Sequence, residues 1–375
     1  MNLQGKEARN AILKGLILFV LLTLLYGVWA GNRSVGNREQ FSLYNLVFPG
    51  RKRLPFGEDS ANAYNLSLFD VNAMFSSHEI DWRQKSGNEF RIILLGDSSV
   101  WGTLLRPDET LAGQLDSMRL TVCGKPASVY NLGYPTLSIT KDLMLLDAAM
   151  RYDPDLIVWG VTLEALPADK QLTSPLVSEN AARVAELIAR YDLPLDPNSP
   201  DLVRRSFWEN TLIGQRRSLA DLVRLQLYGV MWAATGVDQV YPLDYQPAQV
   251  DLEADSSFHD LVGPQLDPSA LAFFALDAGT AAAGTVPVLV FNEPMLVSSG
   301  ANSDIRYNFF YPRWAYDQYR LLMQQAAGTA DWNYVDLWNL VPADQFTNSA
   351  IHLTPAGEAL LADALAGAIL ETRCP

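Results

Sequence analysis

Short apolar runs alternate with capped or amphipathic segments over much of the chain. Five of the runs have the length of a strand and end at turn residues, at positions 90–95, 127–132, 156–159, 286–291 and 334–337. Helical segments separate or follow them at positions 107–115, 138–150, 311–325 and 355–371. Continuous apolar strands that alternate with helices are typical of a parallel sheet covered on both faces. The pattern therefore predicts one α/β domain over residues 90–375.

The N-terminal segment has a different pattern. Residues 11–30 form an apolar run that only Lys14 interrupts, and the run is long enough to span a bilayer. Tyr26 and Trp29 lie at its far end, where aromatic residues meet the membrane surface. We expect residues 1–31 to be a single-pass membrane anchor. The alternative is a secretory signal peptide that is removed.

A polar connector rich in Asn and Ser follows at residues 32–89, and we expect regular structure to begin only at Phe90. Cations flank the apolar run on both sides, with Arg51, Lys52 and Arg53 on the connector side. The charge asymmetry that sets orientation is therefore weak. We expect the N-terminus inside and the body of the protein outside the cytoplasm.

A long insertion at residues 165–280 separates the third and fourth strands. Val184, Leu187, Ile188 and Tyr191 have helical spacing and predict an amphipathic helix within it. A second stretch, residues 219–237, is more apolar. For this stretch a core helix is the first expectation, a lid over the site the second, and a helix on the membrane surface the third.

Composition excludes several classes of function. The net charge of −14 opposes binding to a nucleic-acid backbone. The chain has three histidines, two cysteines and no CxxC pair, so we expect no zinc cluster and no other metal or cofactor. Cys123 and Cys374 form a disulfide in one interpretation. We favour two unrelated thiols, because sequence spacing does not show that they meet.

A nucleophile candidate follows the first strand, in the sequence Gly96-Asp97-Ser98. Sites in parallel sheets form at the carboxyl ends of the strands. A serine there faces the crevice, with backbone N–H groups nearby to bind an oxyanion. Taken alone, the three residues also fit a turn in which Asp97 or Ser98 caps a helix. Further residues at other strand ends are needed to choose between the two interpretations.

Three more strand ends supply such residues. Gly133 follows the second strand, Thr162 follows the third, and His352 stands just before the last helix. Histidine is the side chain suited to take the proton of a serine near neutral pH. His78 and His259 lie in the connector and the insertion, where we expect exposed residues without a role.

Together these blocks resemble the SGNH (GDSL-type) hydrolase superfamily, over residues 90–165 and 285–375. The resemblance implies a flavodoxin-like sheet between helices. It implies Ser98 as nucleophile and His352 as general base. It also implies an oxyanion hole made by the backbone N–H groups of Ser98 and Gly133.

Two departures from the family pattern affect the site. The family has an Asn side chain as a further oxyanion donor where this chain has Thr162, whose hydroxyl has a shorter reach. Asn292 and Glu293, at the end of the fourth strand, are candidates to compensate, and Asp97 is a further supporting residue.

The second departure concerns the acid that orients the histidine. The family has Asp three residues before the histidine, where this chain has Ser349. Asn348 is the residue we expect to orient His352, as Asn does in Cys–His–Asn proteases. Asp344 is another candidate at an unfamiliar spacing.

An acyl-ester enzyme is the function that these residues favour. The first hypothesis is hydrolysis of an ester on a small molecule or glycan at the cell envelope, with the membrane as a partner through the N-terminal helix. The second is transfer of an acyl group, such as acetyl, to or from an envelope glycan. The third is a binding module that keeps the cleft and has lost efficient chemistry, as Thr162 and Ser349 suggest.

Overall fold

One six-stranded sheet forms the centre of the computed structural model, which describes residues 3–31, 46–48, 50–56, 71–237, 244–330 and 332–374. Its strands are β1 (Phe90–Leu95), β2 (Thr121–Val122), β3 (Lys125–Asn131), β4 (Leu156–Val161), β5 (Val288–Asn292) and β6 (Asn333–Asp336). They lie in the order β2-β3-β1-β4-β5-β6. The five strands expected from the apolar runs are all present, β1 with the expected ends and the others with ends that shift by at most two residues.

Strand pairing defines the class of the fold. β1 pairs in parallel with β3 and β4, β4 with β5, and β5 with β6. In chain order these five strands follow the flavodoxin-like arrangement of doubly wound sheets. β2 pairs antiparallel to β3 across a two-residue turn at Cys123 and Gly124, both with positive φ. The sheet is therefore parallel except for one edge strand, which is too short to show in the hydrophobic pattern.

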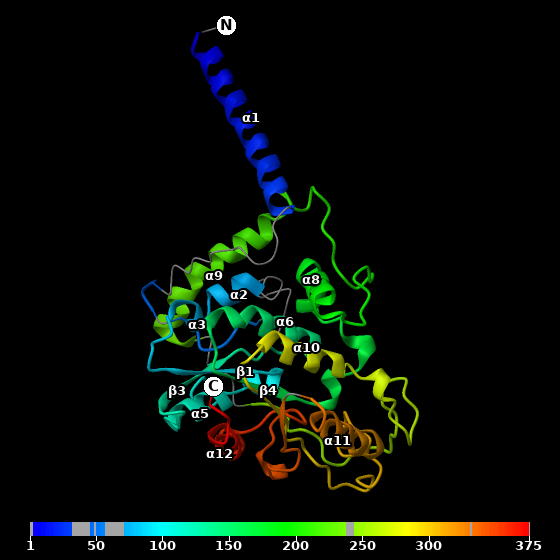
Figure 1. Ribbon diagram of the computed structural model, residues 1–375. Coiled ribbons are helices and arrows are strands. Elements are labelled where there is room, and N and C mark those ends of the chain that lie inside the picture. Colours follow the sequence, from blue (N-terminus) through cyan, green and yellow to red (C-terminus); the bar gives the residue numbers. More distant parts are fainter. Residues whose placement is uncertain are drawn as a thin grey trace.

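Helices cover both faces of this sheet (Figure 1). α6 (Ile139–Ala149) and α10 (Phe273–Ala283) contribute to the apolar core on one face, together with α11 (Arg313–Ala327). α5 (Leu111–Ser117) and α12 (Pro355–Leu370) contribute to the core on the other face. All six residues of β1 are buried, which explains why its sequence is apolar except for Arg91, whose guanidinium pairs with Glu89.

The helix expected from residue 107 begins four residues later than the sequence suggested. Thr110 is its N-cap, and the Thr110 side chain accepts a hydrogen bond of 3.2 Å from the Gly113 N–H. Glu109 and its neighbours form the preceding turn, where Glu109 accepts from the Arg106 N–H. A threonine cap competes with acidic first-turn residues as a start signal, and here the threonine sets the boundary.

Part of the expected connector is folded. α2 (Val71–Ser76) and α3 (Glu79–Trp82) precede β1, and Phe75 and Ile80 are buried in the same core as α6. The expectation that regular structure begins at Phe90 was wrong, because helices of six and four residues are too short to produce a readable period. Residues 32–45 and 57–70 of the connector lie outside the described residues.

His78 was expected to be exposed and is buried, and Arg53 is buried beside the same turn region. His78 Nδ1 accepts from the Ile80 N–H as the cap of α3, and Nε2 lies 3.0 Å from the carbonyl oxygen of Asn131. Burial lowers the pKa of His78 to about 3, so the ring is neutral. The Arg53 guanidinium donates to the carbonyl of Gly102 at 2.7 Å. The connector therefore supports the segment that follows β1.

The described residues of the insertion form α7 (Pro175–Ser178), α8 (Ala181–Tyr191), α9 (Arg216–Thr235) and the first part of α10. α8 confirms the predicted amphipathic helix, because Val184, Leu187 and Ile188 are buried. The expectation that residues 219–237 form a core helix was wrong. Most large apolar side chains of α9 are exposed, and its buried Leu225 belongs to neither core cluster of the described residues.

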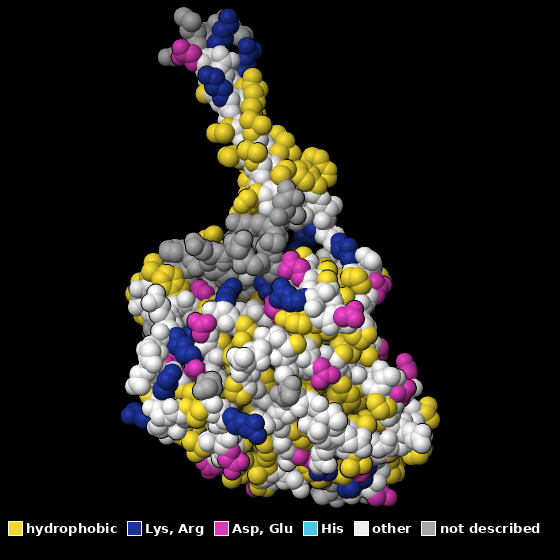
Figure 2. All heavy atoms as spheres, in the orientation of Figure 1, with side chains coloured by type: hydrophobic (Ala, Val, Ile, Leu, Met, Phe, Trp, Pro, Cys, Tyr) yellow, Lys and Arg dark blue, Asp and Glu magenta, His cyan; other side chains and the backbone are white. Residues whose placement is uncertain are grey.

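The N-terminal helix α1 (Leu3–Gly31) stands away from the body (Figure 1). Its apolar side chains are exposed along its length, and basic side chains lie near its far end (Figure 2). Residues Lys6–Ala30 are long enough and apolar enough to cross a membrane. The helix is hydrophobic all round, which is typical of a helix surrounded by lipid.

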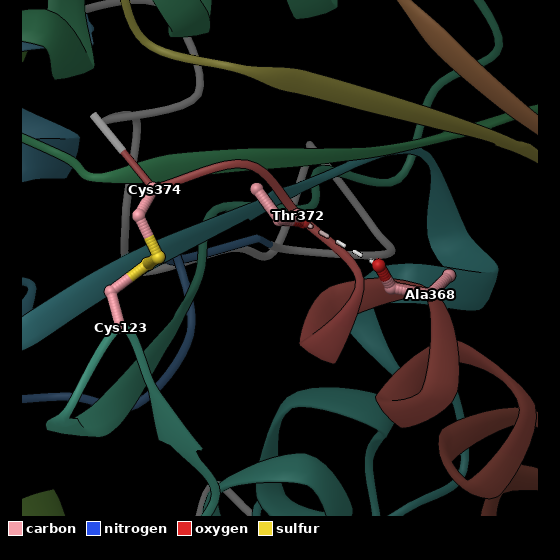
Figure 3. The surroundings of a disulfide bond; sticks show 4 residues. All are labelled: Cys123, Ala368, Thr372 and Cys374. Atoms are coloured by element: carbon pink, nitrogen blue, oxygen red, sulfur yellow. Dashed lines mark hydrogen bonds between the residues drawn. A yellow bond between two sulfur atoms is a disulfide. The ribbon is translucent and has the colours of Figure 1, made fainter.

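A disulfide joins Cys123 to Cys374, with 5.6 Å between the Cα atoms (Figure 3). The interpretation of two unrelated thiols was therefore wrong. Cys123 lies in the turn between β2 and β3, and Cys374 follows α12. α12 packs against α5 and β2, and this packing brings the two ends together.

Breaking this disulfide is expected to lower the free energy of unfolding by about 2–5 kcal/mol, because the cross-link closes a very long loop in the unfolded chain. Urea unfolding with and without reductant measures the loss. The variant with Cys123→Ser and Cys374→Ser is the control, and reductant is not expected to change its midpoint. Equal midpoints for reduced and oxidised wild type would contradict the prediction.

Candidate active site

The turn after β1 places Ser98 at the carboxyl edge of the sheet. Gly96 has φ of +154°, and a Cβ there would lie 2.4 Å from a methyl group of Val100. Glycine is therefore required for the chain to turn this sharply. Asp97 caps the short helix α4 (Ser98–Trp101) by accepting from the Ser99 N–H at 2.8 Å. The capping expected of Asp97 and a reactive position for Ser98 occur together in one turn.

Ser98, His352 and Asn348 form a continuous chain of contacts. His352 Nε2 lies 2.8 Å from Ser98 Oγ, and His352 Nδ1 lies 2.9 Å from Asn348 Oδ1. An amide oxygen is an acceptor, so Nδ1 carries the proton and Nε2 is left to accept from the serine hydroxyl. This is the tautomer that a general base for Ser98 requires.

The loop before α12 holds His352 in place. The Thr347 N–H donates to the carbonyl of His352 at 2.8 Å, and Phe346 bridges to Leu353 in an antiparallel sense. The Thr347 hydroxyl lies 3.3 Å from Asn348 Oδ1, which orients the amide oxygen toward the same side. The imidazole is therefore held by backbone pairing as well as by Asn348.

The other two candidates for orienting His352 are placed differently. Ser349 is half-buried and Asp344 is exposed. Among the described residues, no hydrogen bond joins either side chain to His352. Asn348 is therefore the one of the three that the structure brings to the imidazole.

Burial lowers the pKa of His352 to about 4. The ring is therefore neutral at neutral pH and able to accept a proton. Protonated His352 cannot take the proton of Ser98, so we expect kcat/KM for an ester to fall as the pH drops through about 4 rather than through the ordinary value of about 6.5. A pH–rate profile measures this. An acid limb at the ordinary value would contradict it.

Gly133 lies against α4, the helix that begins at Ser98, and its N–H has a partner. A Cβ at Gly133 would lie 2.6 Å from the backbone nitrogen of Trp101, so only glycine allows this approach. The Gly133 N–H donates to Asn131 Oδ1 at 3.0 Å, and Asn131 Nδ2 donates to the Val100 carbonyl at 2.9 Å. The Ser98 N–H has no acceptor among the described residues. Sequence reasoning missed Asn131, which ties the two turns together.

Thr162 and Asn292 are occupied elsewhere. Thr162 is buried, and its hydroxyl lies 2.6 Å from Tyr311 Oη. Asn292 donates to Asp336 at 2.9 Å and accepts from Tyr316 at 3.2 Å. No hydrogen bond joins Thr162 or Asn292 to Ser98 within the described ranges. Both side chains therefore already have partners, and their roles at the oxyanion stay predictions.

Glu293 lies beneath the Ser98 turn. Its Oε2 accepts from the Ser99 hydroxyl at 2.7 Å, and a Cβ at Gly160 would lie 2.5 Å from its Oε1. Burial, followed by the charge of Asp97, raises the pKa of Glu293 well above its usual range. Burial likewise raises the pKa of Asp97. This shift favours the protonated form of Glu293, whose Oε2 holds α4 in place through the Ser99 hydroxyl.

Glu358 is a second buried acid near this turn. Its pKa is raised to about 8 by burial. Glu293 and Glu358 line one small cavity of about 10 Å³, close to the size of a single water. Glu358 could not be predicted from the sequence, since an acid in the first turn of a helix is normally exposed.

Lys141 on α6 joins the two turns from below, and the sequence analysis missed it. Its ammonium group is fully buried and donates to the Gly96 carbonyl at 2.8 Å and the Tyr134 carbonyl at 3.0 Å. Asp142 lies 2.6 Å away as its ion-pair partner. An ammonium group has three donors, and here three acceptors surround it. The one hint in the sequence is a charged pair inside an otherwise apolar helix.

The described residues contain no cluster of three or more His, Cys, Asp or Glu side chains that could hold a metal. No protein-family model matches the chain, and no curated protein resembles it in sequence.

Several solved structures are similar to the chain. One is a carbohydrate acetylesterase family member from Sinorhizobium meliloti, at 13% identity over 75% of this chain and 99% of that one, with a TM-score of 0.35. An inhibitor-bound aryl esterase from M. smegmatis is similar at 13% identity over 74% and 97%, with a TM-score of 0.34. A lipolytic protein of the G-D-S-L family from Veillonella parvula is similar at 10% identity over 76% and 98%, with a TM-score of 0.35.

Proposed function

We propose that this protein is an acyl-ester hydrolase of the SGNH type, with Ser98 as nucleophile and His352 as general base. The contact of 2.8 Å between Ser98 Oγ and His352 Nε2 is the observation that supports this most directly. The neutral imidazole and its Asn348 contact are what a serine of ordinary acidity needs in order to react. The proposed catalytic domain is residues 90–375, and the folded segment from residue 71 supports it.

In the proposed mechanism, Ser98 Oγ attacks the ester carbonyl carbon while its proton moves to His352 Nε2. The oxyanion accepts a hydrogen bond from the Ser98 N–H. It also accepts one from the Gly133 N–H, which then no longer donates to Asn131 Oδ1. Collapse breaks the ester bond, and the leaving alcohol receives the proton from His352. Water then attacks the acyl-serine with His352 again as base. The products are a carboxylic acid and the free Ser98 hydroxyl.

Asn348 makes this site slower than one with an acid in the same place, because a neutral amide does not stabilise imidazolium by charge. We expect Asn348→Asp to raise kcat by about tenfold, equivalent to about 1.4 kcal/mol. The new carboxylate favours the charged ring, so the acid limb of the pH–rate profile should move to higher pH. Asp344→Asn removes an exposed acid as the matched control. Unchanged kcat in Asn348→Asp would argue against Asn348 as the orienting residue.

Two features of the protein support a location at the membrane of the cell envelope. α1 is long and apolar enough to anchor the protein by one span. The disulfide between Cys123 and Cys374 favours an oxidising compartment, so we place the body outside the cytoplasm. An acylated small molecule or glycan at the envelope is then the proposed substrate.

A serine-reactive fluorophosphonate and p-nitrophenyl acetate test the chemistry on the full chain in detergent. We expect one covalent label per chain, on Ser98, and release of p-nitrophenol. Loss of labelling in Ser98→Ala assigns the site. If the wild-type protein is not labelled and does not cleave the ester, the enzyme proposal is wrong and the binding module is the remaining hypothesis.

Acyl transfer is tested separately from hydrolysis. An acetylated chromogenic ester is supplied with and without an added glycan acceptor. If acetyl groups appear on the glycan faster than acetate is released to water, the proposed activity becomes acyl transfer instead of hydrolysis. Release to water alone supports the hydrolase.

A further inference from the structure

The segment that leads into α9 packs beside the last turns of α1. Tyr26 Oη donates to Gln215 Oε1 at 3.0 Å, and Gln215 is the residue just before α9. A Cβ at Gly27 would lie 3.2 Å from the Phe207 ring and 3.1 Å from a methyl group of Thr211. Figure 1 shows α9 starting at the base of α1 and running across its direction rather than continuing it.

The outward face of α9 is apolar. Val223, Leu227 and Met231 follow one another at a spacing of four residues, and they are 57%, 60% and 58% exposed. Residues at this spacing lie along one side of a helix. Trp208 and Ile213, in the segment before α9, are also large, apolar and exposed. A soluble surface helix has the opposite arrangement, with its polar face outward.

The opposite face of α9 meets the rest of the protein. Leu225 and Gln226 are buried, and the Arg51 guanidinium stands 5.0 Å from the Trp232 ring centroid. The helix is therefore seated on one side, and the apolar stripe of Val223, Leu227 and Met231 faces away from that side.

Charge and position indicate what covers the stripe. α9 contains Arg216, Arg217 and Arg224 against a single acidic residue, in a chain whose net charge is −14. Basic residues beside an apolar face are typical of helices that lie in the surface of anionic membranes. Tyr26 belongs to the aromatic end of α1, which sits at the level of the lipid headgroups in a spanning helix. Because Gln215 contacts Tyr26, α9 begins at that level.

We propose that α9, together with the segment that carries Trp208 and Ile213, lies in the surface of the bilayer that α1 spans and forms a second membrane contact. This inference rests on the proposed anchor, and it goes beyond it. A single helix leaves the body free to rotate and tilt about its end. Two membrane contacts that run in different directions, α1 and α9, determine which face of the body is turned toward the membrane.

The test measures the depth of nitroxide labels in the full chain, reconstituted in vesicles of phosphatidylethanolamine and phosphatidylglycerol. Labels are placed at Leu227→Cys on α9, at Leu18→Cys on α1, and at Leu321→Cys on α11 as an equally exposed control. Collision rates with oxygen, which enters lipid, and with a nickel chelate, which stays in water, give the depth. We expect the oxygen-to-nickel ratio at residue 227 to be several-fold higher than at residue 321 and to approach that at residue 18.

Each other outcome overturns the proposal in a recognisable way. A ratio at residue 227 equal to that at 321, with residue 18 in lipid, keeps the anchor and removes the second contact. Equal ratios at all three positions remove the anchor as well. A label at residue 227 that is shielded from both reagents, with cross-linked pairs of chains, assigns the stripe to a second copy of this protein.

A charge variant gives an independent measurement. With the label at Met231→Cys, Leu227→Asp is expected to lower the oxygen-to-nickel ratio at residue 231 to the value in water. Leu321→Asp is the matched control and should leave that ratio unchanged. Fluorophosphonate labelling of Ser98 checks that each variant is folded. A folded Leu227→Asp variant with an unchanged ratio would refute the contact.

Discussion

Replacing Ser98 with alanine is expected to lower kcat for p-nitrophenyl acetate by about 10⁴- to 10⁶-fold, because among the described residues no other hydroxyl forms a hydrogen bond with the His352 imidazole. His352→Ala should cost a comparable factor, since a serine without a base is a weak nucleophile. Initial rates at saturating substrate measure both effects. Ser99→Ala is the control, because the Ser99 hydroxyl points to Glu293 and not to the imidazole.

The two residues act as one unit, and the double variant tests this. Ser98→Ala combined with His352→Ala should be no slower than either single variant, because each single change already removes the nucleophilic route. Losses that multiply would mean that the two residues contribute separately. The proposed mechanism would then be wrong even if both single variants were slow.

Lys141→Met is expected to have the second-largest effect, and it acts on both stability and rate. It leaves the Asp142 carboxylate and the Tyr134 carbonyl buried without the Lys141 donor, which should cost about 3–5 kcal/mol of unfolding free energy. It also reduces the link between the Gly96 and Tyr134 turns to the bond from the Tyr134 N–H to the Gly96 carbonyl. A displacement of about 1 Å at a reacting group can cost about 10²-fold in rate. We expect kcat to fall by about that factor with little change in KM.

Lys85→Met provides the comparison. Lys85 pairs with Asp155 at 2.6 Å and donates to the carbonyl of Asp153, at the opposite end of the strands from Ser98. Its replacement should leave kcat unchanged. If Lys141→Met lowers the urea midpoint but keeps the wild-type kcat, then Lys141 stabilises the fold without positioning the site.

The hydrophobic pattern was sufficient to predict the central sheet. β1, β4 and β5 are buried on both faces, so each strand is apolar over most of its length, with Arg91 in β1 and Asn292 at the end of β5 as the exceptions. Parallel pairing then places their carboxyl ends at one edge. This is why Ser98 and His352 could be predicted to meet although they are 254 residues apart.

Other features depend on contacts that a pattern does not encode. Lys141 and Asn131 act through backbone carbonyls and N–H groups, which carry no sequence signal. Asn292 stands at the end of β5, as expected, and its amide turns toward Asp336 because the neighbouring strand supplies an acceptor there. The pairing of Cys123 with Cys374 depends on how α12 packs, and no local rule predicts that packing.

The long separation in sequence between Ser98 and His352, and between the two cysteines, affects the order in which the site is assembled during synthesis. Ser98 leaves the ribosome 254 residues before His352, and Cys123 leaves it 251 residues before Cys374. The nucleophile therefore exists in the growing chain well before its base and before the covalent closure. We expect a chain shortened to end before His352 to carry its nucleophile in an inert form, so that reactivity toward esters begins only after His352 has reached Ser98.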